Sequence, residues 1–253
     1  MSYNIRYDNP NDGIDTWQNR KDWVADQIRY YDPGIVGLQE VLHSQLVYLD
    51  SALTSHTYVG VGREDGAEAG EYSPLLIDTT RYEILSSGTF WLSDTPGKPS
   101  VGWDAALERI CTWVRVRDLS GQPYFVLNTH FDHRGELARL RSAQLLTQKI
   151  REMNRSSYPV ILTGDLNTLP SSAPIAHLNT ILNDSKKISI KEPYGPEGTL
   201  NGFDVSNPLH DRIDYILVSD DMEVLEYAVI SEVRAGRSPS DHLPVLVKTR
   251  RKN

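Results

Sequence analysis

Polar residues stand at the ends of six apolar runs in this sequence, where buried strands would meet solvent. They are Asn4, Gln39-Glu40, Asn128-Thr129-His130, Gly164-Asp165-Leu166-Asn167, Asp211-Arg212-Ile213-Asp214 and Ser240-Asp241-His242. One such residue alone is most often a turn or cap residue. Six at separate strand ends are harder to explain in that way, because carboxylates, amides and histidines converging from several strands are what metal-assisted hydrolysis requires. The pattern therefore indicates a hydrolytic site.

Four of these residues indicate a metal ion and a proton-transfer pair. Glu40 is a hard oxygen ligand with no thiolate nearby, which suits Mg²⁺ or Mn²⁺ rather than zinc. Asp241 and His242 are adjacent, so one can serve a metal ion or water while the other transfers a proton. Asp214 would hold the His242 imidazole in one tautomer, as carboxylates do for catalytic histidines.

Three further residues would act on the attacking water and on the phosphorus. Asp165 and Asn167 are two apart, and on an extended segment they would point the same way and position a water. His130 would stabilise the extra charge on a pentavalent phosphorus. Together with the metal ligands, these residues predict the hydrolysis of a phosphoester bond.

The ordered set of motifs resembles the endonuclease/exonuclease/phosphatase superfamily. The motifs are SYNIRY, LQE, NTHFDH, GDLN, RIDY and SDH, and the likeness runs from residue 1 to about residue 248. A single motif such as GDLN is weak, whereas the ordered set is specific. This superfamily has the DNase I-like fold and includes abasic-site endonucleases, deadenylases, sphingomyelinases and inositol polyphosphate phosphatases.

The resemblance implies a role for each matching residue. Asn4 and Glu40 would bind the divalent ion, and Asp241 would lie in the metal region. His242 would be the base or a phosphate-contacting histidine oriented by Asp214, His130 would contact the scissile phosphate, and Asp165 and Asn167 would lie around the attacking water. Either Asp165 or His242 would be the general base.

Five more segments resemble an uncharacterised bacterial subgroup of that superfamily. They are RYDNPNDG, the W-x-x-R spacing from Trp17 to Arg20, GEYS, TFWLS and FDHRG. The resemblance implies that Glu71 and Arg109 face the phosphate pocket. The chemistry of arginine also favours this role for Arg109, because a guanidinium pairs with two phosphate oxygens. The alternative for Arg109 is a surface arginine at the start of a strand.

Many short strands with helices at intervals must position these residues. Helices are expected over Trp17–Tyr31, His43–Leu53 and Gly135–Met153. Strands are expected over Ser2–Tyr7, Ile35–Leu38, Tyr58–Val61, Tyr72–Ile77, Tyr82–Trp91, Arg109–Arg117, Tyr124–Thr129, Val160–Thr163, Ile213–Val218 and Leu243–Val247. No linker divides the chain, which favours one α/β (α+β) domain over residues 1–253, with two packed sheets and helices outside. The resemblance implies a four-layered sandwich of two mixed sheets.

The composition and net charge of the chain limit the classes of substrate that it can bind tightly. The 253 residues include 26 Lys and Arg against 34 Asp and Glu, so the net charge is −8. This acidic balance, without a basic stripe, argues against tight binding of duplex nucleic acid, so a small phosphoester is favoured over nucleic acid. No apolar run approaches the roughly 18 residues of a membrane span, and no amphipathic basic helix is evident, so we expect no stable membrane association.

Two alternatives remain beside a Mg²⁺- or Mn²⁺-dependent phosphoesterase. One is a nuclease acting on DNA or RNA, and the other is an inactive family member that binds a phosphate ligand or a protein. Inactive members usually lose a metal or base residue, whereas every such residue is present here. We expect a monomer, either cytoplasmic or secreted with its signal peptide removed.

Overall fold

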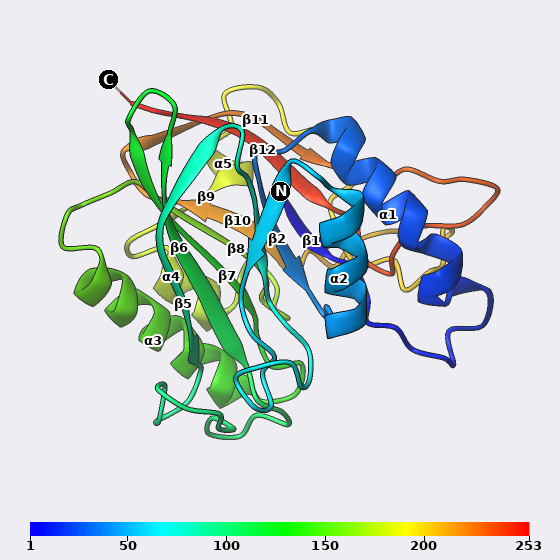
Figure 1. Cartoon of the computed structure of the whole chain (residues 1–253), viewed down its shortest axis with the longest axis horizontal. Coiled ribbons are helices and arrows are strands. Elements are labelled where there is room, and N and C mark those ends of the chain that lie inside the picture. Colours follow the sequence, from blue (N-terminus) through cyan, green and yellow to red (C-terminus); the bar gives the residue numbers. More distant parts are fainter. Residues whose placement is uncertain (253) are drawn as a thin grey trace.

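The computed structural model describes residues 1–252, which form two six-stranded β-sheets stacked face to face (Figure 1). The strand order is β11-β12-β1-β2-β4-β3 in the first sheet and β5-β6-β7-β8-β10-β9 in the second. The strands are β1 (Ser2–Asn4), β2 (Ile35–Gln39), β3 (His56–Val59), β4 (Leu75–Asp78), β5 (Tyr82–Trp91), β6 (Ile110–Asp118), β7 (Pro123–His130), β8 (Val160–Asp165), β9 (Asn183–Asp184), β10 (Asp214–Val218), β11 (Met222–Val229) and β12 (Val245–Arg251). The helices are η1 (Gly13–Asp15), α1 (Trp17–Tyr31), α2 (His43–Ala52), α3 (Glu136–Met153), α4 (Ala173–Leu178) and α5 (Ser185–Ile188).

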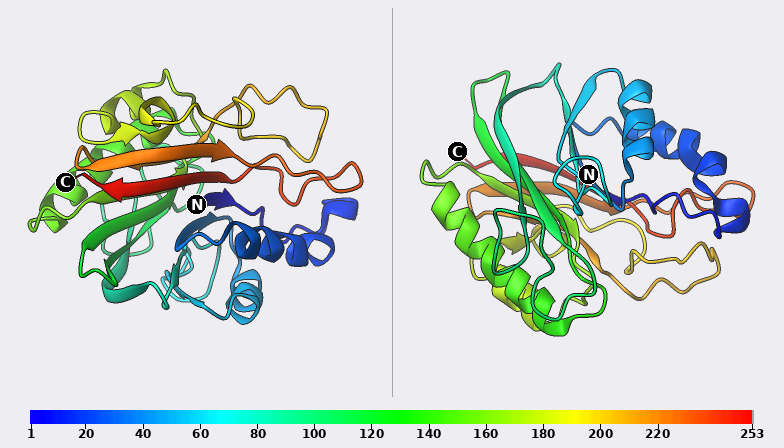
Figure 2. Two further views of the ribbon diagram at one scale, coloured as in Figure 1. Left: turned by 90° about the horizontal axis from the view of Figure 1, so that it is seen from above. Right: turned by 60° about the horizontal axis from the view of Figure 1, so that its bottom comes forward.

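Helices lie outside the two sheets, with α1 and α2 on one side of the molecule and α3 on the other (Figure 2). The buried stripe of α1 includes Val24 and Ile28, which recur at helical spacing, and α3 buries Leu146. Between the sheets, Ile77 of β4 and Val126 of β7 belong to one apolar cluster. Among the described residues, no helix is long and apolar enough to cross a membrane. The arrangement confirms the expected α/β four-layered sandwich.

Most predicted elements agree with the structure to within a few residues. α1 has the predicted bounds, and β6 and β7 form the expected hairpin. β1 is shorter than predicted and ends at Asn4, because Arg6 has a left-handed backbone with φ 58°. The prediction missed β9, β11, α4 and α5. In β11 a bulge between Val224 and Glu226 interrupts the alternation of buried and exposed residues, so its strand pattern is lost.

The pairing of the central strands places their ends at one edge of the sandwich. β1 and β2 run parallel with Asn4 opposite Gln39. In the second sheet, β7 and β8 run parallel with His130 opposite Asp165, and β10 begins at Asp214 opposite the same Asp165. Because parallel strands end at the same edge, most of the polar residues that follow them in the sequence meet there.

The Asn128 side chain joins the two sheets close to this edge. Its Oδ1 accepts hydrogen bonds from Gln39 Nε2 at 2.7 Å and from Thr163 Oγ1 at 2.9 Å. Its Nδ2 donates to the carbonyls of Leu38 at 2.6 Å and Pro74 at 2.9 Å. The amide thus uses its two donors and its acceptor oxygen inside a fully buried interface.

Replacing Asn128 with alanine should destabilise the fold. The substitution removes four buried hydrogen bonds and leaves a cavity between the sheets, so the free energy of unfolding should fall by about 3 kcal/mol. Urea unfolding measures this loss. The exposed Asn19 is the matched control, since Asn19→Ala removes a bond to the Ile14 carbonyl in solvent and should change stability by less than about 0.5 kcal/mol. Equal, small losses for both variants would contradict the role given to Asn128.

Candidate active site

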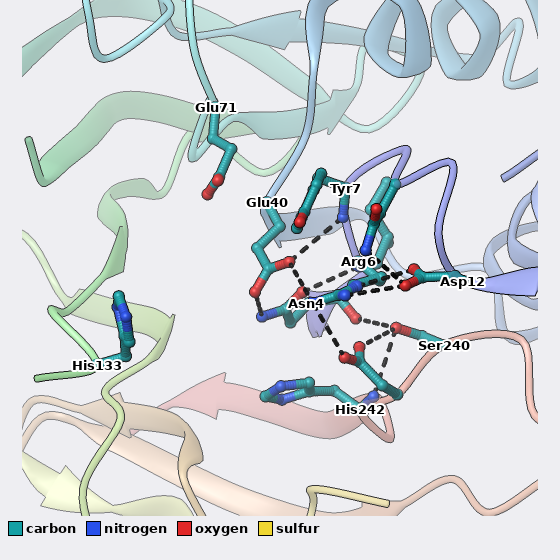
Figure 3. Close-up of polar contacts among 12 residues, drawn as sticks. Asn4, Arg6, Tyr7, Asp12, Glu40, Glu71, His133, Ser240 and His242 are labelled. Atoms are coloured by element: carbon teal, nitrogen blue, oxygen red, sulfur yellow. Dashed lines mark hydrogen bonds and ion pairs between the residues drawn. The ribbon is translucent and has the colours of Figure 1, made fainter. Parts of the chain in front are cut away.

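The Asn4 amide lies between two carboxylates at the edge where the strands end (Figure 3). Its Nδ2 donates to Glu40 Oε1 and to Asp165 Oδ2, both at 3.0 Å. Its Oδ1 accepts a hydrogen bond from the backbone N–H of Arg6 at 3.0 Å. Because Asn4 and Glu40 belong to the first sheet and Asp165 to the second, this amide links the two sheets within the site.

Arg6 lies beside the two carboxylates predicted to bind a metal. Its Nη1 is 3.7 Å from Asp241 Oδ2 and 4.0 Å from Glu40 Oε2. Its Nε and Nη2 donate hydrogen bonds to the two carboxylate oxygens of Asp12, both at 3.0 Å. The backbone N–H of Tyr7 also donates to Glu40 Oε2 at 3.3 Å. Burial raises the pKa of Asp241, and the nearby charge of Glu40 raises it further. Negative charge is therefore concentrated here, with Arg6 as a flanking cation.

His242 and Asp214 form the predicted pair. His242 Nδ1 is 2.8 Å from Asp214 Oδ2, and both side chains are buried. Burial lowers the pKa of His242, but the charges of Asp214 and then Asp165 outweigh it and raise this pKa well above its usual value. His242 Nε2 lies 3.8 Å from Asp165 Oδ2, so the ring stands between two carboxylates.

Asp165 is the most central carboxyl group of the site. Burial, followed by the charge of Asp214, raises the pKa of Asp165 to about 7, although His242 and hydrogen bonds from Asn167 and Asn4 act in the opposite direction. A carboxyl group with such a pKa exchanges its proton near neutral pH, which is the property that a general base needs.

Asn167 adopts a different conformation from the one expected. It has a left-handed backbone, φ 46°, and its N–H donates to Asp165 Oδ1 at 2.9 Å, so the segment turns rather than staying extended. The Asn167 Nδ2 contacts His130 Nε2 at 3.0 Å and donates to the Phe131 carbonyl at 3.0 Å. The side chain therefore orients the His130 ring. His130 Nε2 is also 3.5 Å from Asp165 Oδ2, so all three side chains still converge.

Glu71 forms a buried pair with an arginine that the sequence analysis did not identify. Arg63 donates through Nη1 and Nη2 to the two oxygens of Glu71 at 2.8 and 3.0 Å. Glu71 Oε2 lies 4.0 Å from His130 Nδ1, which has no hydrogen-bond partner among the described residues. Burial raises the pKa of Glu71, and Arg63 opposes this effect. For His130, burial and then the charge of Arg109 lower the pKa well below its usual value, so its ring is neutral.

Arg109 is 4% exposed, which rules out the alternative of a surface arginine. Its Nε is 3.3 Å from Asp132 Oδ2, and its Nη2 is 3.0 Å from His133 Nδ1. Its Nη1 is buried without a hydrogen-bond partner among the described residues. Burial and the nearby positive charge of Arg63 lower the pKa of Arg109.

Side chains from several segments converge on one region. Figure 3 shows Glu71, Glu40 and His242 directed toward the same region from different segments, with His133 on the opposite side. Arg6, Arg63 and the Asp132–His133 pair therefore join the predicted residues. Arg6, Asp132 and His133 lie within the motifs SYNIRY and NTHFDH, whereas Arg63 belongs to no motif and its position depends on the tertiary fold.

The donor set fits a hard divalent cation. Ligand atoms of Glu40, His130 and Asp165 lie within 4.8 Å of one another, as do those of Asp165, Asp214 and His242. Carboxylate oxygens dominate both groups, which is the preference of Mg²⁺ and Mn²⁺.

The predicted metal ligands are not equally placed within these groups. Glu40 belongs to one of them and Asn4 contacts it directly. Asp241 lies outside both groups, beside Arg6. The lone Cys111 is buried in an apolar cluster at the start of β6, and burial raises the pKa of its thiol, so no thiolate joins the set.

Comparison with known proteins finds a phosphatase among the solved structures similar to this chain. Among solved structures it is similar to a mannosyl-6-phosphatase of Bacteroides thetaiotaomicron, with 38% identity, 98% of each chain covered and a TM-score of 0.95. The subgroup expected to be uncharacterised therefore includes a protein with a named activity. D. rerio TDP2 complexed with single-strand DNA product is 20% identical, with 98% of this chain and 97% of that chain covered and a TM-score of 0.76, which shows the fold alone.

The curated relatives are longer proteins. Carbon catabolite repressor protein 4 homolog 5 of Arabidopsis thaliana is 26% identical over 196 residues, which are 72% of this chain and 42% of that protein. The chain spans less than two thirds of the first curated relatives that it matches. The model of the Endonuclease/Exonuclease/phosphatase family matches residues 1–242, nearly the whole chain. The protein belongs to the endonuclease/exonuclease/phosphatase family.

Proposed function

We propose that the protein is a Mg²⁺- or Mn²⁺-dependent phosphatase that hydrolyses the phosphomonoester of a small soluble molecule. The observation that carries this proposal is the buried Asp165 carboxyl group, which lies within 4 Å of His130, His242 and the Asn4 amide. The 38% identity to a mannosyl-6-phosphatase over 98% of the chain supports a monoester, and makes a sugar phosphate the first substrate class to test.

Different side chains would bind the metal ion, accept the proton of the water and stabilise the charge on the phosphate. Glu40, Asn4 and Asp241 would hold Mg²⁺ or Mn²⁺, and the ion would offset phosphate charge and polarise a water. The water oxygen bonds to phosphorus as the bond to the alcohol oxygen breaks; Asp165 accepts a proton of the water, and the departing alkoxide takes up a proton from solvent to leave as the alcohol. His242 is protonated at neutral pH, since its pKa is raised, so it donates to a phosphate oxygen rather than acting as the base.

The remaining residues bind the phosphate and orient its neighbours. Asp214 orients the protonated ring of His242 by accepting a hydrogen bond from its Nδ1 at 2.8 Å. His130, neutral and oriented by Asn167, contacts the phosphate through a hydrogen bond instead of a charge. Arg109, whose Nη1 has no hydrogen-bond partner among the described residues, acts on His130 through its charge and would pair with the phosphate, next to the Arg63–Glu71 pair.

A nuclease is the second candidate, because D. rerio TDP2 with its single-strand DNA product shares the fold. The net charge of −8 gives little attraction for the successive phosphates of a polymer. We therefore place the small ester first and expect a monomer without stable membrane association. A panel of sugar phosphates, other phosphomonoesters, phosphodiesters including sphingomyelin, and single-stranded DNA tests the choice.

Metal dependence is the first prediction. Activity should vanish in EDTA and return with Mg²⁺ or Mn²⁺. Glu40→Gln should raise the metal concentration at half-maximal activity by about tenfold or more, because it removes a charged oxygen ligand. Glu83→Gln is the control, since Glu83 is exposed and paired with Arg117. Full activity in EDTA would contradict the metal, and an unchanged titration for Glu40→Gln would exclude Glu40 as a ligand.

Non-additivity of Asp214 and His242 is the second prediction. His242→Ala and Asp214→Asn should each lower kcat/KM by about a hundredfold or more, with the fold intact by circular dichroism. The double variant should be no worse than His242→Ala by more than about threefold, because the two residues act as a unit. Asp220→Asn, an exposed control, should leave kcat/KM unchanged. Multiplicative losses in the double variant would show that the two residues work separately.

Weak dependence on salt is the third prediction. Between about 50 and about 200 mM salt, KM for the best substrate should change little, because only one phosphate is recognised. Arg109→Ala should raise KM for every leaving group that the enzyme accepts. A steep rise of KM with salt, together with an oligonucleotide that outperforms every small ester, would restore the nuclease interpretation.

A further inference from the structure

Arg20 of α1 is a buried guanidinium, 1% exposed, that contacts backbone carbonyls instead of a carboxylate. Its Nε donates to the carbonyl of Asp15 at 2.8 Å, its Nη1 to those of Ile5 and of Pro239, the latter at 3.2 Å, and its Nη2 to those of Arg6 at 2.7 Å and Tyr7 at 3.4 Å. A guanidinium has five N–H donors in a fixed planar arrangement, and here five carbonyls receive them.

Four of the five carbonyls belong to the two segments that carry predicted metal ligands, and the fifth, that of Asp15, lies next to α1. The segment 5–7 follows Asn4 directly, and Pro239 lies two residues before Asp241. These segments are more than 200 residues apart in the sequence and have no regular ladder between them at this point. One further link joins them, because Ser240 Oγ donates to the Asn4 carbonyl at 2.7 Å.

Arg6 shows why the segment needs such a contact. Its backbone is left-handed, an unfavourable conformation for a residue with a side chain, and this turn directs the Arg6 carbonyl to Arg20. The Arg6 guanidinium meanwhile reaches Asp241 and Glu40. Arg20 thus holds a strained turn whose side chain and neighbours line the site.

We propose that Arg20 is a positioning residue, which sets the spacing between Asn4 and Asp241 so that both can serve one divalent cation. The inference rests on the proposed function, since it assumes that these residues hold a metal ion. A purely structural arginine would instead add stability without affecting the metal. Arg20 also packs between aromatic rings, 5.3 Å from the ring of Trp17 and 5.5 Å from that of Phe203, so stability alone cannot distinguish the two roles.

The chain offers a matched control in Arg115. Its guanidinium lies 4.9 Å from the ring of Trp113 and 5.2 Å from that of Phe125, and it donates to the Met153 carbonyl at 2.5 Å. Like Arg20, it therefore joins two elements through aromatic and carbonyl contacts. It lies on β6, next to the end of α3, and contacts no candidate site residue.

The experiment compares Arg20→Lys with Arg115→Lys in full-length protein stripped of metal. Calorimetry measures the dissociation constant of Mn²⁺, thermal unfolding measures stability in EDTA, and kcat is measured at saturating Mn²⁺. Lysine keeps the charge but cannot reach five carbonyls, so Arg20→Lys should weaken Mn²⁺ binding by about tenfold or more. Its kcat at saturating Mn²⁺ should stay within about threefold of the wild type, and Arg115→Lys should leave the dissociation constant unchanged.

Three results would decide against the inference. An unchanged Mn²⁺ dissociation constant in Arg20→Lys, with lowered stability, would reduce Arg20 to a structural residue. If Arg20→Lys does not fold, Ser240→Ala breaks the second link between the same segments, and unchanged Mn²⁺ binding in that variant would also overturn the proposal. A wild-type protein that binds no Mn²⁺ would overturn the proposed function, and this inference with it.

Discussion

Buried negative charge is the constraint on which the rest of the structure depends. Asp165 and Asp214 are buried at a single edge of the sandwich, and Glu40 and Asp241, each with 14% of its side chain exposed, flank Arg6 at the same edge. Like charges in such surroundings repel strongly, and burial alone already disfavours each ionised carboxyl group. The raised pKa of Asp165, about 7, is the direct consequence. Such a cluster persists only if fixed donors and cations offset it.

The fold supplies those donors from rigid positions. Parallel pairs in both sheets bring the strand ends together, and Asn128 ties one sheet to the other just behind the site. The Asn4 amide and the protonated His242 stand between the carboxylates, while Arg20 holds the backbone around them. These contacts offset the repulsion between the carboxylates and the backbone strain at the site. Sites that lower the stability of a fold in this way are common in active proteins.

The sequence was sufficient for the features that depend on local pattern and strand order. The helix from Trp17 to Tyr31 follows from its apolar spacing, and the Asp214–His242 pair from polar residues at the ends of two buried strands. The convergence of Asn4, Glu40 and Asp165 was predictable for the same reason, aided by the ordered motifs. These features need no knowledge of how loops are arranged.

Other features depend on tertiary contacts that leave no local signal. Arg63 meets Glu71 across a loop that contains glycines with positive φ at Gly66 and Gly70, so nothing in its neighbourhood marks it as part of the site. The segment turns at Asn167 instead of staying extended as expected, because an asparagine tolerates the left-handed conformation. The bulge in β11 interrupts the alternation of buried and exposed residues, so the sequence pattern does not predict this strand.

The pH dependence of stability, with and without the cation, tests the account most directly. In the folded protein the pKa values of Asp165 and His242 are raised, so these two groups stabilise the fold at low pH and lose that contribution as the pH rises, whereas His130, whose pKa is lowered, acts in the opposite direction. In EDTA, the part of the free energy of unfolding that Asp165 and His242 contribute should therefore fall as the pH rises, and each unit of pKa shift corresponds to about 1.4 kcal/mol. Mg²⁺ should replace the protons and flatten this fall, so its stabilising effect should grow with pH. The same pH profile with and without Mg²⁺ would contradict the claim that the buried carboxylates form a cation site.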